Sequence, residues 1–118
     1  MKLGVVGSRD WKDFDFMKRT IDETVKEFPS IDTLISGGAK GVDQVAADYG
    51  RQIGLKVLEY LPDFSHGYSP GEYHKRNERI AKDSDLVLAF QVGQSRGTQS
   101  TINFCRKYKT EVRIYKNG

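Results

Sequence analysis

Three short segments combine glycine with hydroxyl and basic side chains, a composition suited to binding phosphate. They are "GSR" (7–9), "SGGAKGVD" (36–43) and "GQSRGT" (93–98). Glycine lets backbone N–H groups approach a phosphate closely, hydroxyl groups add hydrogen-bond donors, and arginine offers a planar fork that matches phosphate oxygens. A tight turn explains any one of these segments equally well, so the interpretation depends on whether the three meet in space.

We expect the ligand-binding residues to come from these segments and from the stretch "HKRN" (74–77). Neither the Gly-Lys-Ser/Thr ending of a Walker loop nor a GxGxxG motif is present, and we predict no cofactor. The predicted ligand-binding residues are Gly7, Ser8, Arg9, Gly37, Gly38, Lys40, Asp43, Arg76, Asn77, Gly93, Ser95, Arg96, Gly97 and Thr98.

Several polar and aromatic side chains near these segments have two interpretations. Asp43 stands in the first turn of an expected helix, where a carboxylate favours the helix dipole, but it could equally accept a hydrogen bond from a ribose hydroxyl. Trp11 and Tyr68 could stack on a base, although single loop aromatics more often pack against their neighbours. His66 and His74 are not spaced as a metal-binding pair, and no metal site is predicted.

The three segments lie between short β-rich runs and amphipathic stretches, an alternation typical of a parallel sheet covered by helices. Helices are expected from 14 to 28, from 42 to 53, over about 71–82, and after the turn at 93–97; strands are expected at 2–6, 32–36, 55–61, 85–90 and 111–115. The fold class is therefore α/β, a three-layer Rossmann-like domain with a five-stranded, mainly parallel sheet.

Individual residues sharpen this outline. The unbroken apolar run at 85–90 predicts a central strand of the sheet, buried on both faces. Asp13 is expected to cap the first helix. The second helix is expected to include Ile53 in its apolar face and to end at Gly54, and the fourth to turn Cys105 toward the core.

The expected parallel sheet places the candidate site. In an open α/β sheet, ligands bind beyond the carboxyl ends of the strands, near the switch in strand order. Each of the three segments follows an expected strand, so we expect them to meet at one edge of the sheet. The stretch "PDFSHGYSPG" (62–71) is rich in turn-forming residues and predicts a loop that could act as a lid.

The composition limits the class of protein. A chain of 118 residues has room for a single domain, expected over 1–118. Its one cysteine excludes an intrachain disulfide and favours the cytoplasm, and no apolar run is long enough for a signal peptide or a membrane span. The net charge of +3 is too small to indicate nucleic-acid binding by itself.

Three stretches together resemble a known family: "VVGSRDW" (5–11), "SGGAKGVDQVAADYG" (36–50) and "YHKRNERIAKDSDLVLAFQVGQSRGT" (73–98). Their order and spacing are similar to those of the SLOG superfamily of Rossmann-like nucleotide-binding proteins, especially its small, stand-alone YspA-like branch. The resemblance covers nearly the whole chain, and it implies a nucleotide-derived ligand.

Two better understood branches of that superfamily imply different functions. The LOG enzymes cleave nucleoside monophosphates with an arginine and a glutamate. Arg76 matches the arginine, whereas the glutamate of their G-G-x-G-T-x-x-E motif falls on Thr101. Threonine lacks the charge and the acidity for that role, so a LOG-type hydrolase would need a substitute carboxylate, for which Asp43 and Glu78 are the candidates.

The DprA group shares the series "VGxR", "SGxAxGxD" and "RNRxIA", to which "RNERIA" (76–81) is similar. This resemblance implies single-stranded DNA binding, which usually requires a basic groove with several stacking aromatics. We therefore rank three hypotheses. The first is binding of an ADP-ribose-like or cyclic nucleotide signal by a sensor, sequestering protein or processing factor; LOG-type hydrolysis is second and DNA binding third. Resemblance to LOG enzymes also implies a homo-oligomer.

Overall fold

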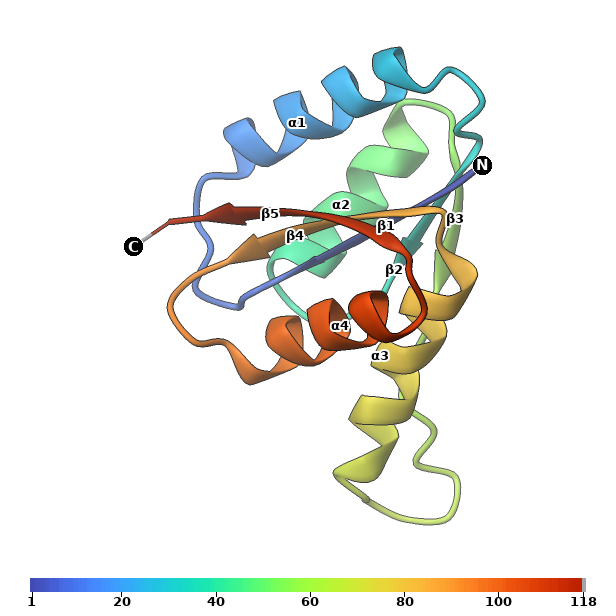
Figure 1. Cartoon of the computed structure of the whole chain (residues 1–118), viewed down its shortest axis with the longest axis vertical. Coiled ribbons are helices and arrows are strands. Elements are labelled where there is room, and N and C mark those ends of the chain that lie inside the picture. The colour runs from blue at the N-terminus through green and yellow to red at the C-terminus, as the bar shows by residue number, and fades with distance from the viewer. Residues whose placement is uncertain (118) are drawn as a thin grey trace.

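The computed structural model describes residues 1–117, which form five strands alternating with four helices (Figure 1). All neighbouring strands are parallel, in the order β3-β2-β1-β4-β5. The predicted α/β Rossmann-like class is confirmed. The elements are β1 (Lys2–Gly7), α1 (Phe14–Glu27), β2 (Thr33–Ser36), α2 (Val42–Gln52), β3 (Lys56–Glu59), α3 (Gly71–Asp83), β4 (Leu86–Gln91), α4 (Arg96–Lys107) and β5 (Glu111–Lys116).

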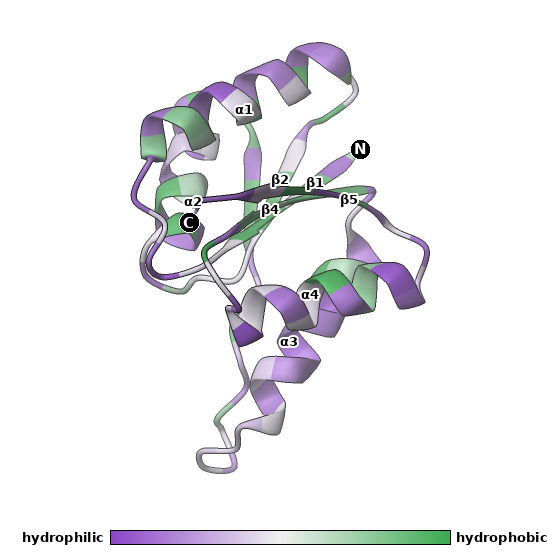
Figure 2. Cartoon of the chain, turned by 60° about the vertical axis from the view of Figure 1, so that its left-hand side comes forward, coloured by the Kyte–Doolittle hydropathy of each residue, from purple (hydrophilic) through white to green (hydrophobic). Residues whose placement is uncertain are grey.

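The helices cover the two faces of the sheet in pairs, α1 with α2 and α3 with α4 (Figure 1). Alternating side chains of β4 separate two buried clusters: Leu86, Leu88 and Phe90 pack under α1 and α2, whereas Val87 and Ala89 face α3 and α4. All six residues of β4 are buried, which confirms the predicted burial on both faces, and β4 lies between the middle strand β1 and the edge strand β5. Hydrophobic residues accordingly gather in the strands, and much of α1 and α3 consists of hydrophilic residues (Figure 2).

The helix ends follow local signals with one exception. Asp13 Oδ1 accepts a hydrogen bond of 3.1 Å from the Phe16 N–H, which confirms the predicted cap of α1. Gly54, with φ +88°, redirects the chain after α2. The prediction for Ile53 is wrong, because α2 ends at Gln52 and the Ile53 side chain is 36% exposed. Cys105 is fully buried, as predicted.

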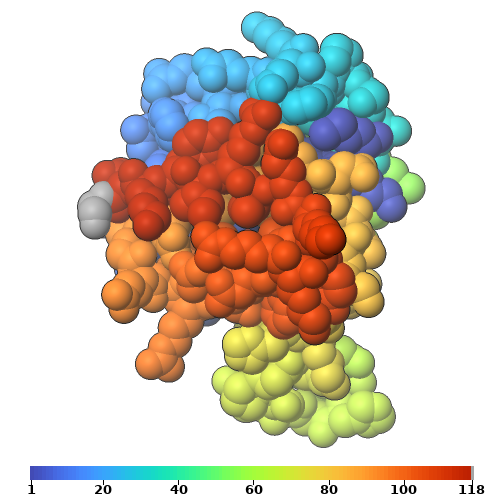
Figure 3. All heavy atoms as spheres, in the orientation of Figure 1, coloured from blue at the N-terminus to red at the C-terminus, as the bar shows by residue number. Residues whose placement is uncertain are grey.

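The third strand is shorter than its apolar sequence suggested. β3 pairs only with β2, and the four residues of β2 give four paired positions, from Thr33 with Lys56 to Ser36 with Glu59. Beyond this point the chain leaves the sheet as a loop over 62–70. The loop and the first turns of α3 project from the body of the molecule (Figures 1 and 3).

Among residues 1–117, no helix combines the length and the apolarity that a membrane span requires.

Candidate functional site

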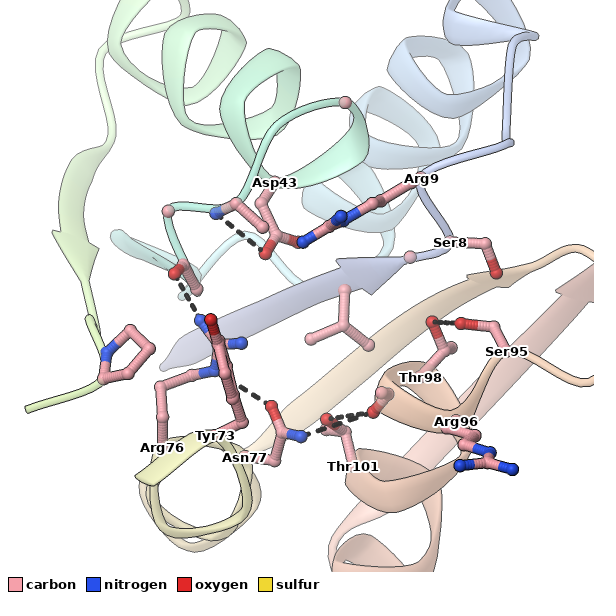
Figure 4. Close-up of a pocket in the computed structure, with 18 of the residues that line it drawn as sticks. Ser8, Arg9, Asp43, Tyr73, Arg76, Asn77, Ser95, Arg96, Thr98 and Thr101 are labelled. Atoms are coloured by element: carbon pink, nitrogen blue, oxygen red, sulfur yellow. Dashed lines mark hydrogen bonds between the residues drawn. The ribbon is translucent and has the colours of Figure 1, made fainter. Parts of the chain in front are cut away.

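A cleft of about 1400 Å³ opens at the carboxyl ends of β1, β2 and β4. It lies at the switch in strand order, because the chain runs from β1 outward through β2 to β3 and then crosses to β4 on the other side of β1. The loops after these three strands meet there, together with α3 (Figure 4). Residues as far apart in the sequence as Val6 and Thr101 therefore form one surface.

The cleft brings most of the predicted ligand-binding residues together. Gly93 does not line it and instead borders a second cavity beside α4. Trp11 is 3% exposed and packs edge-on against Phe90, so it belongs to the core and is not a candidate for base stacking. The predicted residues that line the cleft are Gly7, Ser8, Arg9, Gly37, Gly38, Lys40, Asp43, Arg76, Asn77, Ser95, Arg96, Gly97 and Thr98.

The two candidate substitute carboxylates separate in the structure. Asp43 lines the cleft. Glu78 lies outside its lining, where its Oε2 accepts a 2.6 Å hydrogen bond from the Tyr108 hydroxyl and lies 3.9 Å from Lys107 Nζ. The α3 helix thus turns Arg76 and Glu78 in different directions, and Glu78 is in no position to act on a ligand in the cleft.

The loop before α2 is held by its own side chains. The Ser36 hydroxyl donates to the Asp43 carbonyl at 2.7 Å, and Gly38 and Gly41 adopt positive φ angles of +72° and +86° that other residues rarely adopt. Within the part of the chain described, no side chain caps the first turn of α2 or of α4. Helix N-termini with uncapped N–H groups favour an anion.

Asp43 and Arg76 form the polar centre of the cleft. Asp43 is 7% exposed; its Oδ2 accepts a 3.3 Å hydrogen bond from the Ala39 N–H, and its Oδ1 has no partner among residues 1–117. Burial raises the pKa of Asp43 to about 6, although the Arg76 charge and the Ala39 hydrogen bond oppose the shift. Burial also lowers the pKa of Arg76, and the Asp43 charge opposes that shift.

Arg76 is fixed by two further contacts. Its Nη1 donates to the Gly37 carbonyl and its Nε donates to Asn77 Oδ1 at 2.9 Å. A Cβ on Gly37 would lie 2.7 Å from Arg76 Nη1 and 2.8 Å from Asp43 Oδ2. Glycine at this position therefore makes room for the two charged groups to approach the backbone.

The turn at the start of α4 is tied to α3. Asn77 Nδ2 and Thr101 Oγ1 both donate to the Gly97 carbonyl, at 3.4 and 3.3 Å, and the Ser95 hydroxyl donates to Thr98 Oγ1 at 3.2 Å (Figure 4). Thr101 is 1% exposed at the base of the cleft, so its hydroxyl supports the turn.

Part of the lining of the cleft is not among the residues predicted from the sequence. Leu61, Phe64 and Tyr73 line the same cleft as the glycine-rich loops, and the Arg76 guanidinium lies 5.9 Å from the centre of the Tyr73 ring. The signal that could have found Phe64 and Tyr73 is the recurrence of aromatic residues through the turn-rich stretch 62–73.

Comparison with known proteins identifies the family. The model of the YspA, cpYpsA-related SLOG family matches residues 1–67, more than half of the chain. The chain belongs to this SLOG family. The match includes the first two glycine-rich loops and the strands that precede them, and the third loop completes the cleft of this SLOG protein from outside the matched region. A search of curated protein sequences gave no significant match.

Solved structures share the fold of this SLOG protein. DNA processing protein A from Helicobacter pylori, whose single-stranded DNA binding mode has been described, has a TM-score of 0.76 at 18% identity and covers 97% of this chain and 64% of its own. DprA from Streptococcus pneumoniae has a TM-score of 0.57 at 15% identity, with coverages of 95% and 58%.

The C-terminal domain of a hydrogenase from Pyrococcus furiosus has a TM-score of 0.50 at 13% identity and covers 96% of this chain and 89% of its own. The present chain spans less than two thirds of either DprA chain. At these identities the likeness shows a common fold alone.

Proposed function

We propose that this SLOG protein binds a nucleotide or a nucleotide-derived small molecule, such as an ADP-ribose-like or cyclic nucleotide signal, by its phosphate. One observation carries the proposal: three strand-end loops and two uncapped helix N-termini face a single cleft. Backbone N–H groups and helix dipoles at such ends favour negative charge. The basic side chains that line the cleft strengthen this preference; they are Arg9, Lys40, Arg76 and Arg96.

The biological role that we propose is that of a sensor, a sequestering protein or a processing factor for this ligand. Membership of the SLOG family supports a nucleotide-derived ligand, because the matched residues 1–67 include two of the three loops that form the cleft. A homo-oligomeric state and a cytoplasmic location remain predictions, and sedimentation velocity tests the first.

Calorimetric titration tests the function. We expect at least one of AMP, ADP-ribose and cyclic AMP to bind more tightly than about 1 mM, which corresponds to about 4 kcal/mol. Arg96→Ala should weaken binding, because it removes an exposed cation at the start of α4. Arg19→Ala is the matched control, since Arg19 is an exposed arginine on α1, away from the cleft. Absence of binding by all three ligands, or equal effects of the two variants, would contradict the proposal.

A second candidate function is hydrolysis of an N-glycosidic bond. The observation in its favour is Asp43, a buried carboxyl with a pKa of about 6 beside Arg76, because a group that titrates near neutral pH can exchange a proton with a substrate. Product analysis distinguishes hydrolysis from binding. Release of free base from AMP, abolished by Asp43→Asn while AMP still binds, would establish the enzyme.

A third candidate is single-stranded DNA binding, which the shared fold with the Helicobacter pylori protein supports. Contacts with several phosphates make such binding fall steeply with salt concentration. A titration with a thymidine oligonucleotide at increasing salt is the test. An undetectable or salt-independent signal would remove this candidate.

A further inference from the structure

Phe64, Tyr68 and Tyr73 form an aromatic wall on one side of the cleft. Their ring centres are 5.4 Å apart for Phe64 with Tyr68 and for Phe64 with Tyr73, and 6.3 Å apart for Tyr68 with Tyr73. All three line the same cleft as the three glycine-rich loops. Two come from the loop over 62–70 and the third from the first turn of α3, the part of the molecule that projects in Figures 1 and 3.

The aromatic wall does not support the hydrophobic core. Its members belong to neither of the buried clusters that hold the sheet and helices together. Tyr68 is 73% exposed and Phe64 is 37% exposed, and Leu61 beside them is 57% exposed. Clustered exposed apolar side chains at the mouth of a cleft indicate a binding surface.

The loop that carries the aromatic wall is ordered by its own hydrogen bonds. The Gly67 N–H donates to the Phe64 carbonyl at 3.0 Å, and the Ser65 N–H donates to the Asp63 carboxylate at 2.9 Å. Gly67 has a φ of +99°, which turns the chain back between Phe64 and Tyr68. This turn brings the Phe64 and Tyr68 rings to 5.4 Å from each other, and a turn that is already formed reduces the backbone entropy lost on binding.

The charges in the cleft favour one orientation of a bound nucleotide. In Figure 4, Tyr73 and Arg76 lie on one side and Ser95 and Thr98 on the other, and the Asp43 carboxylate comes down from the start of α2 near Arg76. Both α2 and α4 begin with uncapped N–H groups that attract a phosphate, but α2 carries the Asp43 carboxylate in its first turn, whereas α4 carries no acidic residue there. A phosphate at the start of α4 leaves the opposite side of the cleft, where Tyr73 lies, for the remainder of the ligand.

We propose that the aromatic wall is the base-binding half of the site, with Tyr68 stacking on the nucleobase while the start of α4 holds the phosphate. This inference rests on the proposed function and narrows it. The ligand class becomes nucleotides with an aromatic base, and simple sugar phosphates are excluded as preferred ligands. Every base has a π-face, so stacking gives affinity for nucleotides in general and leaves the choice of base to other contacts.

Two probes that differ only in the base test the inference. Calorimetric titrations compare AMP with ribose 5-phosphate on the wild-type chain and on Tyr68→Ala. We expect the wild type to bind AMP more tightly, and Tyr68→Ala to lose about tenfold or more in AMP affinity but no more than about twofold in ribose 5-phosphate affinity. Tyr68→Phe keeps the ring and should keep the AMP affinity. Ile53→Ala, at an exposed apolar residue outside the cleft, is the matched control.

The outcomes separate this inference from the proposed function. If AMP and ribose 5-phosphate both fail to bind and none of the other nucleotides binds, the proposed function itself is wrong. If ribose 5-phosphate binds as tightly as AMP, or Tyr68→Ala weakens both probes equally or neither, only the base-binding role is wrong. Sedimentation velocity of Tyr68→Ala tests the alternative that a second copy of the chain binds at the aromatic wall. A loss of self-association with unchanged AMP affinity would make the aromatic wall an interface between two copies of the chain.

Discussion

Replacing Asp43 with asparagine is expected to remove a pH-dependent loss of stability from the folded protein. Asp43 is 7% exposed and burial raises its pKa from 3.8 to about 6. The folded state therefore binds this proton more tightly than the unfolded state does. The free energy of unfolding contributed by Asp43 consequently falls as pH rises from about 3.8 to about 6, and the loss is complete above that window.

The size of the effect follows from the two pKa values. A difference of about 2 units corresponds to about 3 kcal/mol at neutral pH, since each unit is worth about 1.4 kcal/mol. At about pH 4.5 the same linkage leaves a cost of about 1 kcal/mol. Asparagine does not titrate, so the stability difference between Asp43→Asn and the wild type should grow by about 2 kcal/mol in favour of the variant from about pH 4.5 to about pH 7.5.

Urea denaturation of both proteins across this pH range measures the change. Any loss of the Arg76 interaction or of the Ala39 hydrogen bond changes the stability difference between variant and wild type by the same amount at every pH. The test is therefore how this difference changes with pH. Asp10→Asn controls for net charge, because Asp10 is an exposed carboxylate on the same cleft. A difference that is constant with pH, or that moves in favour of the wild type as pH rises, would refute the burial argument.

Two further predictions concern residues that hold the cleft and the core. Gly7→Ala should lower the free energy of unfolding by about 1–3 kcal/mol or more, because its Cβ would lie 2.7 Å from both Cγ atoms of buried Val42. Gly97→Ala, with nothing within 4 Å of its Cβ, should leave stability unchanged or raise it, and equal losses in urea denaturation would contradict the packing argument. Cys105 is fully buried and burial raises the pKa of its thiol to about 11, so a thiol reagent at neutral pH should label it only after denaturation; rapid labelling of the native protein would show that the α4 side of the core opens.

The parts of the fold that sequence predicted well are those with a local cause. The apolar run at 85–90 is a strand buried on both faces, and Asp13 caps α1, because each signal acts within a few residues of the chain. The prediction for Ile53 was wrong for a related reason. The apolar periodicity of α2 continues to Ile53, but the helix ends at Gln52, just before the turn at Gly54. The β3 strand is shorter than its sequence suggests because the length of its partner limits it.

The candidate site shows the same division. Sequence alone indicated which glycine-rich loops follow strands, since glycine, hydroxyl and basic residues mark those turns locally. It left Asp43 and Glu78 equally eligible as substitute carboxylates, and it treated Trp11 and Tyr68 alike. The structure separates both pairs: Asp43 is buried in the cleft and Glu78 faces Tyr108, while Trp11 is in the core and Tyr68 is exposed at the cleft.

The sequence by itself therefore determined the elements, the class of the fold and the composition of the loops, because these depend on neighbours along the chain. The tertiary structure decided that Asp43 is deprived of solvent beside Arg76, with a pKa of about 6, and that Phe64 and Tyr73 share a cleft with Ser95. Those facts depend on the order β3-β2-β1-β4-β5, which brings distant segments to one edge of the sheet. Distances between such segments are set by crossovers and packing, and no local pattern of residues encodes them.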